Sequence, residues 1–317
     1  MRGLLIVNRH ATSMTGTVAD LAVRSLAGLA ELQIERTQYR GHARDLAAET
    51  DADVIIVHGG DGSVNEVVNG VMSRASADGP GADGPGADGR GRPLIAIIPG
   101  GGANVLARSL GLPVDAAAAI RQLREALEAG RSRTIGLGLA GDRYFTFSAG
   151  LGWDAEVVGE VDRLRAEGHR ESPALFLRTM LRTYYRSTER RRPALTLERD
   201  GGPPVSDLFM TIITNRSPWT YLNSRAVLPV PRPDFSSGLD VLAMRRLRLL
   251  RLVAVVGQML YIRSRPPRGR DLLAVLGSET LTVRSARPIA FQVDGEYLGE
   301  TEAVKFQFVP HSLRVVT

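Results

Sequence analysis

The sequence contains no cysteine and a single lysine, Lys305, among its 317 residues. Without cysteine the chain forms no disulfide bond and carries no thiolate metal site or cysteine nucleophile, which suits a reducing compartment such as the cytoplasm. Long apolar runs are also missing. The apolar run within the first ten residues is too short for a signal peptide. The longest apolar run elsewhere, residues 252–262, has about half of the length that a bilayer crossing needs. We therefore expect a globular cytoplasmic protein without a transmembrane segment.

The positive charge is carried almost wholly by arginine. The net charge is +6 and the isoelectric point is near 10.1. Arginines crowd into residues 182–192, 245–252 and 263–270. A basic surface with interleaved apolar residues can face anionic lipid or nucleic acid, and a solvated arginine-rich face is the alternative interpretation. No recognised nucleic-acid motif or aromatic platform accompanies the arginines, so we expect no nucleic-acid partner.

The pattern of apolar residues predicts two domains. Residues 1–132 alternate strand-like and helix-like segments, which is typical of a parallel sheet covered on both faces. Residues 77–91 hold three copies of a Gly- and Pro-rich pentapeptide and are predicted to be a flexible insertion. From residue 133 to 300, strand-like runs separated by turns predict an antiparallel sheet or sandwich, interrupted by helices. Residues 301–317 are expected to return to the N-terminal domain.

The stretch "DVIIVHGGDGSVNEVVNG" (53–70) runs from a buried strand into a glycine-rich turn and then a helix. In parallel sheets such turns bind ligands, because the helix N-terminus offers unpaired N–H groups and partial positive charge. Three residues without a Cβ let the main chain approach a phosphate, namely Gly59, Gly60 and Gly62. Asp61 would repel a phosphate unless a divalent cation lay between them, so the turn predicts a nucleotide with Mg²⁺. A purely structural turn is the alternative.

A second glycine-rich loop repeats this arrangement. Residues 98–113 again place glycines between a strand and a helix, and Asn104 offers an amide to a nucleotide. Two such loops beyond adjacent strand ends can hold one nucleotide from both sides. Neither loop matches the Walker pattern, and no dinucleotide fingerprint follows the first strand.

These residues resemble the diacylglycerol kinase catalytic domain family, which includes soluble bacterial lipid kinases, sphingosine kinases and ceramide kinases. "GGDGSVNEVVNG" (59–70) is similar to the GGDGT-x-x-E-V-x-N-G motif of that family. Three further segments resemble family motifs in the same order, and they are "PGGGANVLARSLGLP" (99–113), "SAGLGWDAEVV" (148–158) and "FQVDGEYLG" (291–299). Together these motifs are specific, and they cover nearly the whole chain.

The resemblance implies a Rossmann-like α/β nucleotide domain, related to NAD kinases and phosphofructokinases, followed by an antiparallel β-sandwich that holds lipid. It implies transfer of the ATP γ-phosphoryl group to a lipid hydroxyl, with diacylglycerol as the favoured acceptor and phosphatidic acid as the product. The implied ATP-binding residues are Asn8, Thr12, Gly59, Gly60, Asp61, Gly62, Ser63, Glu66, Gly100, Gly101, Gly102 and Asn104. Asp61 would also organise Mg²⁺ at the phosphates, and Glu66 would brace the loop.

The resemblance also assigns the acceptor side. The Asp294-Gly295-Glu296 turn would bring the general base to the lipid hydroxyl, with Glu296 favoured over Asp294, and Asp154 would line the acceptor pocket. Phosphoryl transfer needs such a carboxylate within hydrogen-bond reach of the attacking hydroxyl. Taken alone, Asp-Gly predicts an ordinary hairpin, and Asp154 is equally suited to be a helix N-cap.

The sequence departs from the family pattern near the phosphates. Gly102 stands where threonine is usual, and Val105 stands where aspartate is usual. In the region of a second, structural metal site, Asp234 is present but Ser237 replaces the second acid. These departures keep open a nucleotide-binding regulator with weak or no catalysis, beside a soluble small-molecule kinase of the NAD kinase type.

The stretch 172–192 has apolar residues on one predicted helical face and arginines elsewhere. This pattern predicts peripheral association with an anionic membrane surface from the cytoplasm. The sequence is also compatible with a homodimer.

Overall fold

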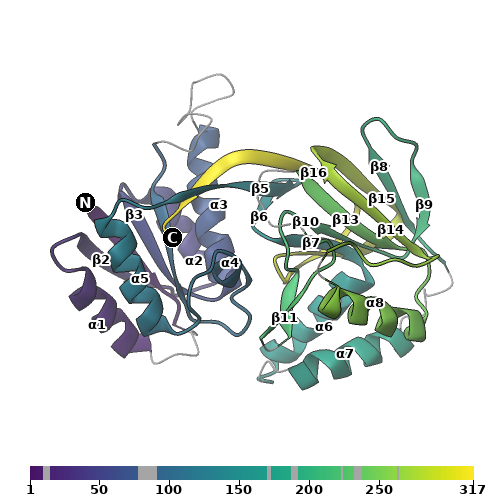
Figure 1. Ribbon diagram of the computed structural model, residues 1–317, viewed down its shortest axis with the longest axis horizontal. Coiled ribbons are helices and arrows are strands. Elements are labelled where there is room, and N and C mark those ends of the chain that lie inside the picture. Colours follow the sequence, from purple (N-terminus) through teal and green to yellow (C-terminus); the bar gives the residue numbers. More distant parts are fainter. Residues whose placement is uncertain are drawn as a thin grey trace. The chain divides into compact units, whose positions relative to one another are not determined.

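The computed structural model (Figure 1) divides the chain into two compact units. The residues it describes are 1–9, 15–77, 91–169, 173–186, 192–222, 224–231, 238–262 and 264–317. Unit 1 comprises Met1–Leu137 with Pro310–Thr317, and unit 2 comprises Gly138–Val309. The sequence analysis placed this division after residue 132 and began the C-terminal segment at 301. Apart from Ala77 and Gly91, the predicted insertion lies outside the described residues.

Unit 1 is built on a parallel sheet with the strand order β4-β3-β1-β2. The strands are β1 (Arg2–Val7), β2 (Glu31–Arg36), β3 (Val54–Gly59) and β4 (Leu94–Pro99). Every residue of β3 is buried, as expected for a strand covered on both faces. Beside β4, the end of β16 (Glu296–Val315) adds one parallel pair, Val315 with Ile95.

Helices cover both faces of this sheet (Figure 1). They are α1 (Thr15–Leu26), α2 (His42–Glu49), α3 (Asp61–Ala77), α4 (Val105–Ser109) and α5 (Ala116–Glu128). One core cluster joins α1 and α5 to the sheet, with Ile56 and Ile98 fully buried against Leu26 and Ile120. On the opposite face α2 packs tightly on α3. A Cβ on Gly70 would lie 2.2 Å from the Arg44 carbonyl oxygen, so only glycine permits this approach.

Unit 2 is built on antiparallel strands with the order β14-β13-β10-β7-β15-β16. These strands are β7 (Ser148–Gly152), β10 (Met210–Thr214), β13 (Leu239–Met244), β14 (Leu272–Ser278), β15 (Thr280–Val293) and β16. Two further pairs of strands extend this sheet. One is β5 (Arg133–Ala140) with β6 (Arg143–Phe145), in which β5 pairs with β16, and the other is β8 (Leu195–Arg199) with β9 (Val205–Leu208), in which β8 pairs with β15. β11 (Thr220–Leu222) and β12 (Arg225–Val227) form a separate hairpin.

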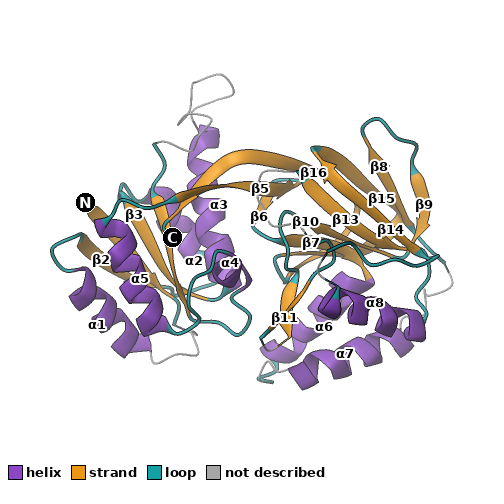
Figure 2. Cartoon of the chain, in the orientation of Figure 1, coloured by secondary structure: helices purple, strands orange, loops and turns teal. Residues whose placement is uncertain are grey.

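The central strands of unit 2 are apolar on both faces. Along β10, Ile213 contributes to a core formed among the strands, whereas Met210 and Ile212 contribute to a second core beneath helices. These helices are α6 (Trp153–Ala166), α7 (Pro173–Arg186) and α8 (Leu249–Tyr261), and Figure 2 shows them gathered on one side of the strands. Among the described helices, none has the length and hydropathy required to span a bilayer.

Candidate active site

The first glycine turn joins β3 to α3 without an intervening loop, because Gly59 ends the strand and Asp61 begins the helix. A Cβ on Gly59 would lie 2.6 Å from the hydroxyl oxygen of Ser63. That hydroxyl accepts a hydrogen bond of 2.6 Å from the side-chain amide of Asn8, which follows β1. The neighbouring ends of β1 and β3 thus bring Asn8, Gly59 and Ser63 together.

The two glycine loops of unit 1 touch each other. A Cβ on Gly101 would lie 2.6 Å from the Cα of Gly60, and a Cβ on Gly60 would lie 3.2 Å from the Cα of Gly101. The Gly100 N–H also donates to the Gly59 carbonyl oxygen at 2.9 Å. Side chains at these positions would force the loops apart. At Gly62 and Gly102, by contrast, a Cβ would meet nothing within 4 Å.

Helix α4 is capped by Asp61 and not by Asn104, the residue that precedes it. Asn104 has a left-handed backbone with φ of 45°, and its side chain bonds its own loop, accepting from the Gly101 N–H at 3.0 Å and donating to the Gly101 carbonyl at 2.7 Å. It therefore does not cap the helix that it precedes. Asp61 does so from α3, since its Oδ1 accepts from the Leu106 N–H at 3.2 Å. Asp61, which belongs to the first glycine turn, is thus hydrogen-bonded to the helix that follows the second glycine loop.

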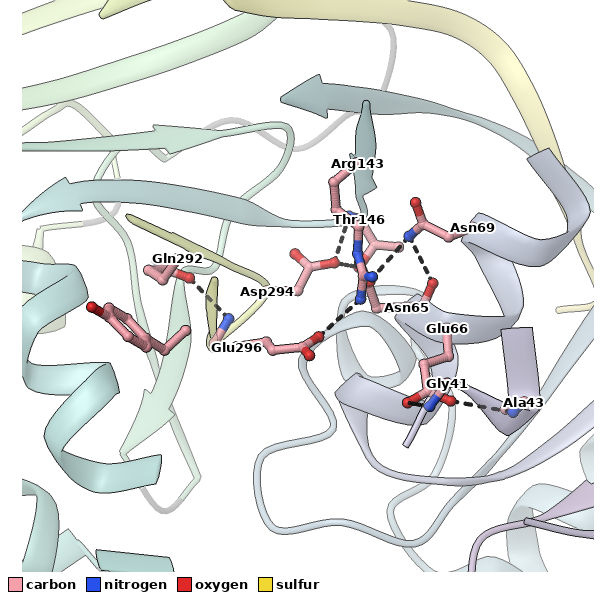
Figure 3. A network of polar contacts seen from close by, with 12 residues as sticks. Gly41, Ala43, Asn65, Glu66, Asn69, Arg143, Thr146, Gln292, Asp294 and Glu296 are labelled. Atoms are coloured by element: carbon pink, nitrogen blue, oxygen red, sulfur yellow. Dashed lines mark hydrogen bonds and ion pairs between the residues drawn. The ribbon is translucent and has the colours of Figure 1, made fainter. Parts of the chain in front are cut away.

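Glu66, one turn further along α3, lies against a different helix (Figure 3). Its two carboxylate oxygens accept from the Gly41 N–H at 2.9 Å and the Ala43 N–H at 3.2 Å. Gly41 is the N-cap of α2 and supplies no side-chain cap. Glu66 therefore stabilises the start of α2, whereas the sequence analysis expected it to brace the glycine loop.

The residues of unit 1 fit the phosphates of a nucleotide. Two closely packed glycine turns lie at adjacent strand ends, beside the N-terminus of α3, where the helix dipole favours an anion. No group of three or more acids or histidines suited to a metal occurs among the residues that the structure describes. Asp61 is the acidic side chain of this turn, at the first residue of α3. Thr12 and Asp234 lie outside the described residues.

The predicted turn at Asp294 is an ordinary two-residue hairpin between β15 and β16, with φ of 47° at Asp294 and 77° at Gly295. The carboxylate of Asp294 is 5% exposed. It accepts four hydrogen bonds of 2.7–3.0 Å, from the Thr146 N–H, the Thr146 hydroxyl, the Phe147 N–H and the Ser148 N–H. Asp294 therefore anchors the hairpin to the chain leading into β7 (Figure 3).

Glu296 lies in a different environment, although it is only two residues away. Its Oε2 pairs with Arg143 Nη2 at 2.8 Å, and the two side chains are 19% and 20% exposed. Arg143 comes from β6, and nothing in its local sequence pointed to the pair. Of the two acids in the turn, Glu296 is the more exposed.

Asp154 is the second residue of α6, and Gly152 is the N-cap, so the N-cap interpretation of Asp154 is wrong. Its side chain accepts a hydrogen bond of 2.9 Å from the Gln292 amide and is almost fully buried. This burial raises the pKa of Asp154 to about 6. A Cβ on Gly150 would lie 2.1 Å from the Asp154 carboxylate, so glycine makes room for the acid.

Gln292 connects Asp154 with the hairpin. While its amide nitrogen donates to Asp154, its oxygen accepts from the Gly295 N–H at 3.0 Å. The residue is 1% exposed. Gln292 was not predicted as a site residue. The feature that could have indicated it is a single amide side chain in the otherwise apolar segment "FQV".

An apolar pocket, partly open to solvent, lies beside Asp154. Its walls come from α6, α7, α8, β10 and β13, and include Trp153, Val157, Phe176, Met180, Met210 and Met259. Asp154 is the acidic residue of the lining. A pocket with apolar walls and one carboxylate suits a ligand with a long apolar body and a hydroxyl group.

Part of the chain is similar to a known family and to named proteins. Residues 2–138 match the family described as the diacylglycerol kinase catalytic domain. A probable YegS-like lipid kinase of Chromohalobacter salexigens is 38% identical over 112 residues, which are 35% of this chain and 30% of that protein. A diacylglycerol kinase of Bacillus subtilis is 35% identical over 120 residues, or 38% of this chain and 34% of that protein. The match spans about a third of the length of these relatives.

Solved structures share the fold over the whole chain. A putative diacylglycerol kinase from Bacillus anthracis aligns with a TM-score of 0.73 at 22% identity, covering 99% of this chain and 96% of that one. An NAD kinase from Archaeoglobus fulgidus in complex with ATP aligns with a TM-score of 0.51 at 14% identity, covering 100% of this chain and 94% of that one. The predicted fold class, a parallel α/β part followed by antiparallel strands, is confirmed.

Proposed function

We propose that this chain, which belongs through residues 2–138 to the diacylglycerol kinase catalytic domain family, is an ATP-dependent lipid kinase. It transfers the γ-phosphoryl group of ATP to the hydroxyl of a lipid alcohol. The favoured acceptor is diacylglycerol, since relatives such as the Bacillus subtilis protein are named diacylglycerol kinases. The product is then phosphatidic acid. We place the reaction in the cytoplasm, at the inner face of the membrane.

The observation that carries the proposal is the pair of packed glycine turns beside Asp61. Because Gly60 and Gly101 pack main chain against main chain, no side chain covers the surface at the N-terminus of α3. A triphosphate on this surface would meet N–H donors and the partial positive charge of the helix. Asp61 would hold Mg²⁺ against the phosphates. When bound, Mg²⁺ neutralises charge on the transferred phosphoryl group. Because Asp234 lacks the second acid at Ser237, we propose no further metal site.

The acceptor side is supported by the pocket of unit 2. Its apolar walls would take an acyl chain, and Asp154 would accept a hydrogen bond from a hydroxyl of the lipid head group. The Gln292 bridge ties Asp154 to the hairpin that carries Glu296. The acid that orients the acceptor and the acid that deprotonates it are thereby part of one hydrogen-bonded structure.

The roles in the reaction follow from these environments. Glu296 accepts the proton of the lipid hydroxyl as its oxygen forms a bond to the γ-phosphorus, and the bond to the bridging oxygen of ADP breaks. Asp294 cannot take this role without losing four hydrogen bonds, so it holds the hairpin. Arg143 orients the Glu296 carboxylate before the substrate binds. The homodimer remains a prediction.

A soluble kinase of the NAD kinase type is the second candidate, favoured by the shared fold. The experiment that separates the candidates incubates purified protein, Mg²⁺ and labelled ATP with a total lipid extract, with diacylglycerol, or with NAD. Label in a lipid that disappears in Asp61→Ala and Glu296→Gln supports the proposal. Label in NAD alone, or ATP binding without transfer to any acceptor, contradicts it, and the latter result favours a nucleotide-binding regulator.

A further inference from the structure

Helix α8 has two apolar faces, yet only one of them is buried. The inner face packs into the helix-covered core of unit 2 through Leu252, Val255 and Met259, which are 2–6% exposed. The outer face consists of Leu250, Val253, Ala254, Gly257 and Tyr261. Leu250 is 86% exposed, Val253 63% and Tyr261 70%. A soluble helix normally carries polar residues on such a face, and Arg251 is the only charged residue of α8.

Hydrogen bonds at both ends hold α8 in place, so its outer face stays exposed. Tyr184 of α7 clamps the start of α8, because its hydroxyl accepts from the Leu249 N–H at 3.0 Å and donates to the Leu247 carbonyl at 3.3 Å. At the other end the Gln258 side chain bonds the main chain of Arg268 in both directions. The inner face cannot rotate outward without emptying the core, so the apolar outer face is presented continuously.

The exposed charges that flank α8 in the sequence are positive. Between Asp240 and Asp271 the sequence contains eight arginines and no acidic residue. Arg248 is exposed directly before the helix, and Arg265, Arg268 and Arg270 are exposed after it. Asp271 is 8% exposed and is paired with Arg251 and Arg246, so it does not offset the remaining arginines.

A further cation adjoins the outer face itself. The guanidinium of Arg225, from the separate hairpin of unit 2, lies 4.9 Å from the centre of the Tyr261 ring. An apolar stripe with a tyrosine at one end and arginines at both ends has the composition of a helix that lies in a membrane interface.

We infer that the outer face of α8 is the surface by which this protein docks on an anionic lipid bilayer. Leu250 and Val253 enter the acyl boundary, Tyr261 lies at head-group depth, and the flanking arginines meet anionic head groups. This inference rests on the proposed function for its biological meaning, since the inner residues Leu252, Val255 and Met259 line the pocket proposed for the acyl chain. One helix would thus contact the membrane on one side and the bound lipid on the other.

A second copy of the chain is a poorer occupant. A twofold dimer through α8 would bring the same arginine-rich flanks of both copies against each other, and these flanks lack acidic residues to pair with them. The segment 172–192, from which the sequence analysis predicted membrane association, has a smaller described contribution. Of its apolar side chains, Leu181 is 37% and Tyr185 is 63% exposed on α7.

The test is co-sedimentation with vesicles of phosphatidylcholine mixed with phosphatidylglycerol, and with vesicles of phosphatidylcholine alone. The double variant Leu250→Asp with Val253→Asp should bind the anionic vesicles at least about tenfold more weakly than wild type. The control Leu276→Asp, at a residue of β14 that is 52% exposed, should bind like wild type. Equal thermal midpoints of the two variants and wild type would show that all are folded.

A second arm tests the charge. Arg248→Gln with Arg265→Gln should weaken binding to anionic vesicles by about fivefold for each arginine, with a larger effect at low salt. Arg121→Gln with Arg131→Gln, at exposed positions of unit 1, should have no effect. Binding of the α8 double variant that equals wild-type binding would overturn the inference. So would a wild-type dimer that the variant splits without any change in vesicle binding.

Phosphorylation of a short-chain diacylglycerol dispersed in detergent separates this inference from the proposed function. We expect the α8 double variant to keep this activity within about twofold and to lose at least about tenfold with substrate embedded in anionic vesicles. Vesicle binding that depends on α8, without phosphorylation of any lipid, would leave docking intact and refute the kinase. Phosphorylation of a lipid without vesicle binding that depends on α8 would support the kinase and refute docking through α8.

Discussion

The carboxylate of Glu296 lies 2.8 Å from the guanidinium of Arg143, in an ion pair that is about one-fifth exposed. A pair in such a position can open when a ligand arrives, because solvent reaches both groups. The carboxylate of Asp294, in the same hairpin, accepts four hydrogen bonds from Thr146, Phe147 and Ser148 on the chain that leads into β7. The two acids of one turn thus differ in what they can do, which leads to the first prediction.

Glu296→Gln should lower phosphoryl transfer at least about 100-fold, since it removes the proposed base. Its cost in stability should stay within about 1 kcal/mol, as for other partly exposed ion pairs. Asp294→Asn should instead destabilise unit 2 by about 3 kcal/mol or more, because an amide cannot accept four donors. Steady-state kinetics and urea denaturation on both variants provide the measurement. A stable, inactive Asp294→Asn beside an active Glu296→Gln would reverse the assignment.

Glu66→Ala should destabilise unit 1 by about 1–2 kcal/mol, because two N–H groups at the start of α2 lose their acceptor. Its affinity for ATP should change little, since the carboxylate contacts α2. Glu49→Ala, at an exposed position at the end of α2, is the matched control and should leave stability unchanged. Denaturation curves and calorimetric ATP titrations check both points, and a loss of ATP affinity at full stability would mean that Glu66 acts on the nucleotide.

Gly101→Ala should weaken ATP binding at least about tenfold, because its Cβ would lie 2.6 Å from the Cα of Gly60 and would force the loops apart. Gly102→Ala, one residue later, meets nothing within 4 Å and should bind ATP within about twofold of wild type. Titration calorimetry with ATP and Mg²⁺ compares the two variants directly. Equal affinities would show that the contact between the loops does not shape the phosphate site.

Asp154→Asn should make the protein more stable at neutral pH. Burial raises the pKa of Asp154 from 3.8 to about 6, so between these values the native state binds more protons than the unfolded state. Wild-type stability therefore falls as the pH rises through this window, by up to about 3 kcal/mol at pH 7. The amide still accepts from Gln292 and carries no charge, so the variant should lack this slope.

Urea denaturation between pH 4 and 7 at intervals of about one pH unit measures the slope. The control Asp142→Asn, at an exposed position, should follow wild type. Wild type and Asp154→Asn with parallel profiles would show that the buried acid does not titrate in this window. Asp154 is a buried acid that lowers stability at neutral pH and lines the pocket, which is typical of a functional residue. Asp154→Asn should therefore also lower the rate of phosphoryl transfer to the lipid acceptor by a large factor.

Local patterns were sufficient for much of the fold. The run "VIIVHG" predicted β3 because a strand covered on both faces must be apolar at every position. The glycine turns were predicted beside each other because parallel strands end at the same edge of a sheet, and Gly60 and Gly101 are in contact. The motifs lie in contiguous residues, so they also predicted the family whose catalytic domain matches residues 2–138.

The partners of the acids could not be predicted in this way. Arg143 is 153 residues from Glu296, and Gln292 is 138 residues from Asp154. Asp61 was expected at the phosphates and also caps α4, while Glu66 caps α2, because each helix lacks a capping side chain of its own. Such hydrogen bonds depend on which chain segments the packed fold brings together.

The amino-acid sequence by itself determined the strand and helix pattern, the glycine turns and the arginine-rich charge, since these depend on neighbours within a few residues. Only the tertiary structure decided that Asp294 is buried and Glu296 accessible, that Asp154 adjoins an apolar pocket, and that α8 exposes a second apolar face. The physical reason is that burial and hydrogen-bond satisfaction are set by segments distant in the chain, whose packing no local pattern records.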